Sequence, residues 1–182
     1  DRTLDTALTF LWCVGSILEI AATVWVISRW LKSAEQGGIQ WITFTPVFFI
    51  PVVGNVLAPL GGVSIGLEAW STAQFGIGIF LWVVLQTLLF VRSAQAGPLP
   101  ARMLPAWFIT VVPPSIGGLS LLQLDAPITL VWMMWGIGAF FLSLALTQVA
   151  GIREQPFSMA HWGMSFPLAA FTSLTLRMAH AP

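Results

Sequence analysis

The sequence predicts an all-α integral membrane protein in which straight helices alternate with proline-kinked ones. Hydrophobic residues make up 57% of the 182 residues, charged residues only 8%, and the mean hydropathy is +0.88. Soluble domains contain about 25% charged residues, so this chain could not cover a water-facing surface. Three of its apolar stretches are long enough to cross a bilayer and contain proline near the middle.

Six apolar segments have the length of a membrane-spanning helix, which is about 20 residues. The expected spans are Leu8–Trp30, Phe44–Val63, Thr72–Val91, Leu104–Leu122, Ile128–Val149 and Ser158–Leu176. Short connections marked by glycine and proline make neighbouring spans antiparallel hairpins. We expect residues 1–182 to form a single transmembrane domain. Because the chain opens with Asp1 and its first apolar run already has spanning length, we expect this domain to be a piece of a longer protein.

Proline interrupts every second span. The residues at these breaks are Pro51, Pro113, Pro114 and Pro167. Proline lacks an N–H and clashes with the carbonyl four residues earlier, so it kinks a helix. In lipid the freed carbonyl must find a partner or face a water-filled cavity, so repeated breaks indicate a pathway or binding site. The alternation predicts an inner ring of kinked helices around a central pore, backed by an outer ring of straight helices.

The basic residues predict the orientation of the spans. Five of the seven follow the first, third and fifth spans. They are Arg29, Lys32, Arg92, Arg102 and Arg153. Because Lys and Arg are enriched in cytoplasmic loops, these connections are expected in the cytoplasm and both ends of the chain outside.

Several classes of function are poorly supported by the composition. The formal net charge is zero, so no basic face for nucleic acid is expected. One cysteine and two histidines allow no internal disulfide and give little support for a metal site. The chain lacks an HExxH motif and paired acids within reach on one helix, so we expect no enzyme activity, no metal and no cofactor.

Three segments carry a resemblance to a known family: FTPVFFIPVVGNVLAPLGG, PAWFITVVPPSIGG and HWGMSFPLAAFT. They resemble the tellurite-resistance/dicarboxylate transporter family, which includes bacterial TehA, fungal malate permeases and the plant slow anion channels. The resemblance implies a fold of ten helices in five hairpins around a central pore, usually in a homotrimer. This chain would correspond to helices four to nine, in a multi-pass protein of the bacterial inner membrane.

The resemblance also implies the function, which is passage of small anions across the lipid bilayer. The candidate anions are monovalent ions such as chloride or nitrate, organic acids such as malate, and oxyanions such as tellurite. A proton-coupled secondary transporter of C4-dicarboxylates is the alternative. A membrane scaffold that transports nothing is a third possibility, although it would not need three broken helices.

Phe166 precedes Pro167 on the last broken segment, and the resemblance implies that it is the aromatic gate of the pore. A bulky apolar ring at a kink can block ions by dewetting until it rotates. PVFFIPVV at 46–53 matches PAWFITVV at 105–112, an offset of 59 residues, which makes Phe49 and Phe108 equivalent. These two are candidate pore rings, for which packing is the stronger expectation.

Small polar residues near the breaks are candidate pore-lining donors. They are Thr45, Asn55, Thr110, Ser115 and Ser165. An anion in hydrocarbon needs donors that replace its water, and hydroxyls supply them without a fixed charge that would hold the anion too firmly. The alternative for each hydroxyl is a hydrogen bond to a carbonyl of its own helix or to a neighbouring helix.

Two titratable residues are candidates for proton coupling. Glu19 is an acid inside a straight span, and intramembrane acids are costly and frequently functional. A structural hydrogen bond is at least as strong an explanation for it. His161 lies one turn before Phe166 and could sense pH or attract anions when charged, although a hydrogen bond to a neighbour is favoured.

Overall fold

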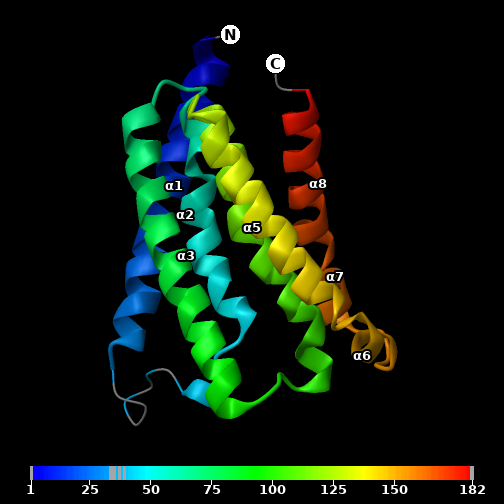
Figure 1. The fold of residues 1–182 in the computed structure, drawn as a ribbon. Coiled ribbons are helices and arrows are strands. Elements are labelled where there is room, and N and C mark those ends of the chain that lie inside the picture. The colour runs from blue at the N-terminus through cyan, green and yellow to red at the C-terminus, as the bar shows by residue number, and fades with distance from the viewer. Residues whose placement is uncertain (1, 33–35, 37, 39, 181–182) are drawn as a thin grey trace.

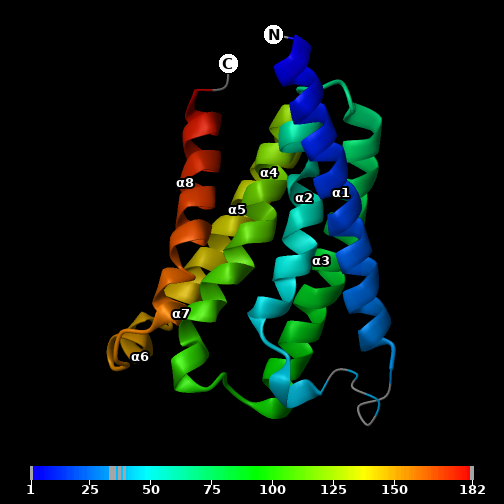
Figure 2. The ribbon, with the colours of Figure 1, turned by 180° about the vertical axis from the view of Figure 1, so that it is seen from behind.

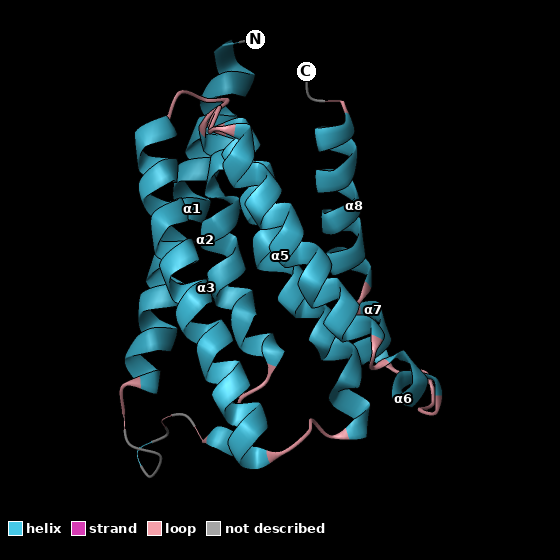
Figure 3. Cartoon of the chain, viewed as in Figure 1, coloured by secondary structure: helices cyan, strands magenta, loops and turns pink. Residues whose placement is uncertain are grey.

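The computed structural model describes residues 2–32, 36, 38 and 40–180 of the chain, and in this part all regular structure is helical (Figure 3). The elements follow in the order α1 (Arg2–Trp30), η2 (Trp41–Thr43), η3 (Pro46–Phe49), α2 (Ile50–Gly62), α3 (Glu68–Ala96), η4 (Ala101–Val111), α4 (Val112–Gln123), α5 (Ile128–Leu146), α6 (Val149–Arg153), α7 (Met159–Trp162) and α8 (Ser165–Ala179), where η denotes a 3₁₀ helix. The expected all-α membrane fold is confirmed.

The segments run up and down, so the two ends of the chain lie at one end of the bundle (Figure 1). The C-terminal ends of α1, α3 and α5 lie at the opposite end. The five basic residues of the first, third and fifth connections therefore gather at that opposite end. This is the arrangement that the charge pattern predicts, and the assignment of that end to the cytoplasm stays a prediction.

The segments that contain the breaks, α2, α4 and α8, lie next to one another with α4 in the middle. The straight helices α3 and α5 cover one side of this row, and Figure 2 shows the other side, with α2, α4 and α8 in front. Helix α1 packs against α2 and leaves most of its surface exposed. Thus α3 and α5 have the expected position behind the broken segments, whereas α1 flanks the row.

Four helical segments of the described chain are long and apolar enough to cross a membrane. They are Asp5–Trp30, Glu68–Ala96, Ala101–Gln123 and Ile128–Leu146. The second and sixth expected spans are shorter, because each is split near its start. The second consists of η3 and α2 (Pro46–Gly62), and the sixth consists of the short helix α7 followed by the 15 residues of α8.

The position of the prolines differs from the expectation of a kink in the middle of an α-helix. Pro51 lies in the first turn of α2, and Pro113 and Pro114 lie in the first turn of α4. Pro167 is the third residue of α8. Proline is tolerated in the first turn because its missing N–H has no partner there. The spans are therefore broken at junctions between two helical segments, at which the prolines begin a new α-helix.

The core lies where α2 and α4 meet α3. Val52, Val56 and Val111 are fully buried in it, together with Leu85 and Leu89 of α3. The hydroxyl of Ser120 on α4 donates to the Val56 carbonyl of α2 over 2.7 Å. Both residues of this hydrogen bond are buried, and the bond holds α2 and α4 at a fixed distance from each other.

Candidate functional site

A cavity of about 360 Å³, called the hollow below, lies between the three broken segments α2, α4 and α8. Its lining comes from α2, from the junction of η4 and α4, and from the residues around the start of α8. The lining residues are Ile50, Val53, Gly54, Leu57, Ile109, Val112, Gly163, Phe166 and Pro167. Segments separated by more than 100 residues along the chain therefore line one open hollow.

Phe166 is positioned at this hollow by the start of α8. The loop between α7 and α8 ends at Met164, and Phe166 and Pro167 lie in the first turn of α8. Phe166 is 50% exposed, whereas the adjacent Pro167, which also lines the hollow, is buried. A half-exposed ring beside a cavity can change its rotamer without breaking a packed core, which is what a gating residue requires.

Among the described residues, no charged or hydroxyl side chain lines the cavity wall. Its lining is aliphatic, aromatic, glycine or proline. An ion in this hollow would meet apolar surface and backbone only. An apolar constriction in a pore excludes ions while it is narrow and dry, and an apolar wall offers them no tight binding site when it is wet.

The expected hydroxyl donors do not line the cavity. Thr110, Ser115 and Ser165 donate to carbonyls three or four residues earlier, at Trp107, Val111 and Trp162, each over 2.7 Å. Thr45 precedes η3 and is partly buried. The structure therefore places the three bonded hydroxyls in the alternative role, a hydrogen bond within their own helical segment, and their contact with an anion stays a prediction.

Phe49 and Phe108 are 1% and 3% exposed, and neither lines the cavity. Phe49 belongs to the central core, and Phe108 packs in a second cluster with Ala145 and Ile152. Pro113 and Pro114 are likewise buried. The two phenylalanines thus pack in the core of this structure, and their role as pore rings stays a prediction.

Asn55 belongs to a buried chain of hydrogen bonds that joins α1, α2 and α3. Its Nδ2 donates to Thr23 Oγ1 over 2.7 Å and to the Pro51 carbonyl over 3.1 Å. Its Oδ1 accepts from Gln74 Nε2 over 3.3 Å. Gln74 Oε1 accepts in turn from Ser16 Oγ over 2.6 Å. The Pro51 carbonyl, in the first turn of α2, thus accepts from a side chain. The carbonyl freed by the missing N–H of Pro51 is that of Val47, and it accepts from the backbone N–H of Ile50 instead.

The sequence reasoning missed three members of this chain, namely Ser16, Thr23 and Gln74. A signal for the first two is present, because Ser16, Glu19 and Thr23 are spaced by three and four residues and so share one face of α1. A polar stripe on an otherwise apolar span indicates contact with another polar helix face.

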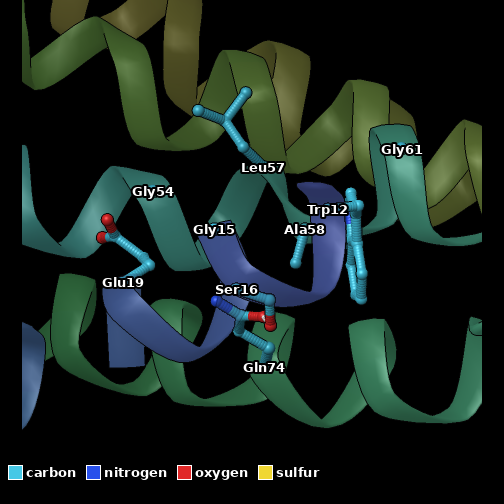
Figure 4. A pocket seen from close by; sticks show the side chains of 9 residues that line it. All are labelled: Trp12, Gly15, Ser16, Glu19, Gly54, Leu57, Ala58, Gly61 and Gln74. Atoms are coloured by element: carbon cyan, nitrogen blue, oxygen red, sulfur yellow. Dashed lines mark hydrogen bonds between the residues drawn. The ribbon is translucent and has the colours of Figure 1, made fainter. Parts of the chain in front are cut away.

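Glu19 lies on this stripe, and its side chain stands outside the hydrogen-bond chain. Thr23 Oγ1 donates to the backbone carbonyl of Glu19 over 2.8 Å, but the buried carboxyl oxygen Oε1 has no partner in the described part of the chain. Figure 4 shows the carboxyl directed toward Gly54 of α2. A second cavity of about 360 Å³ lies here between α1 and α2, and below it is called the cavity at Glu19.

His161 is held by the loop that precedes α7. The backbone N–H of Ser158 donates to His161 Nδ1 over 3.1 Å, and the imidazole stacks on Phe157 with ring centroids 5.3 Å apart. Ser158 and His161 together cap the start of α7. This is the hydrogen bond to a neighbour that was favoured for His161, and its role in coupling stays a prediction.

Residues 1–181 match the protein family described as voltage-dependent anion channel. The chain belongs to this family. The S-type anion channel SLAH2 of Arabidopsis thaliana is 28% identical over 157 residues, which cover 84% of this chain and 29% of the plant protein. The family membership confirms the resemblance that the broken segments suggested.

Two further relatives come from an archaeon and a fungus. The uncharacterized transporter MJ0576 of Methanocaldococcus jannaschii is 24% identical over 185 residues, covering 89% of this chain and 52% of that protein. The sulfite efflux pump SSU1 of Trichophyton rubrum is 24% identical over 205 residues, which cover 92% of this chain and 53% of the fungal protein. The chain thus spans about half the length of these two relatives, and less than a third of the plant channel. No solved structure matches it.

These relatives are named as a channel, a transporter and an efflux pump. Together with the apolar helices, they support an integral, multi-pass membrane protein of a family that carries anions. By these names the relatives are transport proteins.

Proposed function

We propose that this member of the voltage-dependent anion channel family provides a passive path for small anions through the hollow between α2, α4 and α8, with Phe166 as its gate. One observation carries the proposal: residues from all three broken segments line a single cavity, and the half-exposed ring of Phe166 lies on its wall. The absence of charge from that wall favours weakly selective passage over tight binding.

The permeating anions belong to the classes that the resemblance implies: monovalent anions, small organic acids such as malate, or oxyanions such as tellurite. The protein is proposed to act as a homotrimer in the inner membrane of a bacterium. The apolar faces of α1 and α5 that the bundle leaves exposed are available for contact with lipid or with another protomer. The mass of the detergent-solubilised protein would test the trimer.

The proposal is tested by current through planar bilayers that contain the purified protein. Under an anion gradient, we expect the reversal potential to follow the anion and to be unchanged when the cation is replaced. Chloride, nitrate, malate and tellurite substituted in turn would rank the substrates. A reversal potential that follows the cation would contradict anion passage.

The proton-coupled alternative makes a different prediction for the same preparation. A coupled carrier of C4-dicarboxylates would accumulate malate in vesicles when a proton gradient is imposed at zero voltage. We expect flux that depends on voltage and on the anion gradient, and no accumulation driven by the proton gradient. Accumulation of malate under these conditions would favour the carrier and contradict a passive path.

A further inference from the structure

The buried Oε1 of the Glu19 carboxyl has no hydrogen-bond partner in the described part of the chain, although its polar neighbours on α1 have partners. On the same face of α1, Ser16 and Thr23 are both engaged with α2 or α3 through hydrogen bonds of 2.6 to 3.0 Å. None of these bonds uses the Glu19 carboxyl, and its buried Oε1 has no donor among the described residues. A buried carboxyl oxygen without a hydrogen bond is costly, so a purely structural role would be expected to supply one.

The missing side chain of Gly54 makes room for this carboxyl. A Cβ atom placed on Gly54 would overlap the Glu19 carboxyl group. The cavity beside it is lined by Ser16, Gln74 and several small residues as well as by Glu19 (Figure 4). The acid therefore has space for a small ligand and lies directly against the backbone of a broken segment.

Gly54 also borders the proposed pore. Gly54 and Leu57 line both the cavity at Glu19 and the hollow that contains Phe166. Ile50 and Val53 face the hollow, whereas Ala58 and Gly61 face the cavity, so the two spaces touch neighbouring faces of α2. A charge on Glu19 is thus separated from an ion in the hollow by little more than the α2 backbone at Gly54.

Among the described residues of α1, α2 and α3, no other charge is placed to cancel that of Glu19. Helix α2 contains no titratable residue. The other described titratable side chains of α1 and α3 lie elsewhere along α1 or near the ends of α3: Asp5, Cys13, Arg29, Glu68 and Arg92. The groups on α3 that face this region are the neutral side chains of Trp70 and Gln74.

We propose that Glu19 is a proton-binding site that controls the entry of anions into the hollow beside Gly54. This inference rests on the proposed passage of anions between α2, α4 and α8. When Glu19 is ionised, its negative charge repels an anion in the hollow. When it binds a proton, the repulsion is removed, so anion conductance rises as the pH falls.

Coulomb's law gives the size of the effect. A unit charge about 10 Å from an anion, at an effective dielectric constant of about 20, changes the occupancy of the anion roughly tenfold. The effect comes from protonation of Glu19 and is present when the pH is the same on both sides of the membrane. It therefore needs no proton gradient and is distinct from proton-coupled transport.

The test compares anion current of the wild-type protein and the Glu19→Gln variant across a series of symmetric pH values. Glutamine has nearly the same shape and cannot ionise, and the carboxyl it replaces makes no hydrogen bond in the described structure, so the variant is expected to fold. We expect roughly tenfold higher current for wild type at low pH than at high pH. Glu19→Gln should hold the high current at every pH.

Two matched variants complete the experiment. Glu19→Asp keeps an ionisable group and should retain a pH-dependent current. Glu68→Gln removes an exposed acid in the first turn of α3 and should retain the wild-type profile. The same pH profile in wild type and Glu19→Gln would overturn this inference while leaving anion passage intact. Absence of anion current from the wild-type protein would overturn the proposed function, and the inference with it.

Discussion

Replacement of Phe166 by alanine is expected to raise anion conductance about tenfold. The ring is half exposed on the wall of the hollow. If Phe166 gates the proposed passage, an ion passes only when this ring moves aside. Displacing half of a phenylalanine side chain from its apolar contacts costs on the order of 1.5 kcal/mol. A barrier lowered by about 1.4 kcal/mol increases a rate about tenfold. Single-channel conductance and open probability in planar bilayers would measure the change.

The chain offers a matched control for this substitution. Phe140 on α5 is 55% exposed, close to the exposure of Phe166, but it does not line the hollow. Phe140→Ala removes the same number of atoms and should leave conductance unchanged. Phe166→Leu keeps an apolar side chain at the gate and should give an intermediate conductance. Equal currents from wild type and Phe166→Ala would show that Phe166 is not the gate.

The all-α membrane fold was predictable from two features of the sequence: its apolar composition and the recurrence of proline in every second span. Few charges and long apolar segments predict membrane helices, and the alternation of straight and broken segments predicts which of them meet in the middle. The local geometry of the breaks was not predictable in the same way. Proline both kinks a helix from within and begins a new one, and only the preceding 3₁₀ segments η3 and η4 show that Pro51 and Pro113 begin helices.

The candidate site was predictable only in part. A sequence identifies the residues at a break, but it does not show in which direction their side chains point. The position of Phe166 beside Pro167 identifies a residue at a break, and the structure places it on the hollow. Phe49 and Phe108 carry the same type of signal, yet they point into the core. Their direction depends on the packing of α3 and α5 against the broken segments, which the repeat pattern does not encode. The link from Ser16 to Asn55 depends likewise on contacts between three helices.

Substitution of Gly78 by alanine is expected to destabilise the bundle by about 2 kcal/mol, within the range typical of overpacking. Gly78 is buried on α3 where this helix approaches α2. A Cβ atom there would lie 2.6 Å from Val56 Cγ2 and 2.8 Å from the Val56 backbone nitrogen. A side-chain rotation could relieve the first contact, but only separation of the helices relieves the second. Small residues allow such close approach of membrane helices.

Gly76 provides the control on the same helix, because a Cβ atom at Gly76 meets nothing within 4 Å. Gly76→Ala should leave stability unchanged or raise it by up to about 1 kcal/mol, since alanine is the better helix former. Unfolding in mixed detergent micelles with increasing dodecyl sulfate would measure both variants. Equal unfolding midpoints for the two would contradict the close contact of α2 and α3.

Because α2 also supplies Gly54 and Leu57 to the hollow, the loss of stability in Gly78→Ala should be accompanied by altered anion current. Gly76→Ala should conduct as wild type does.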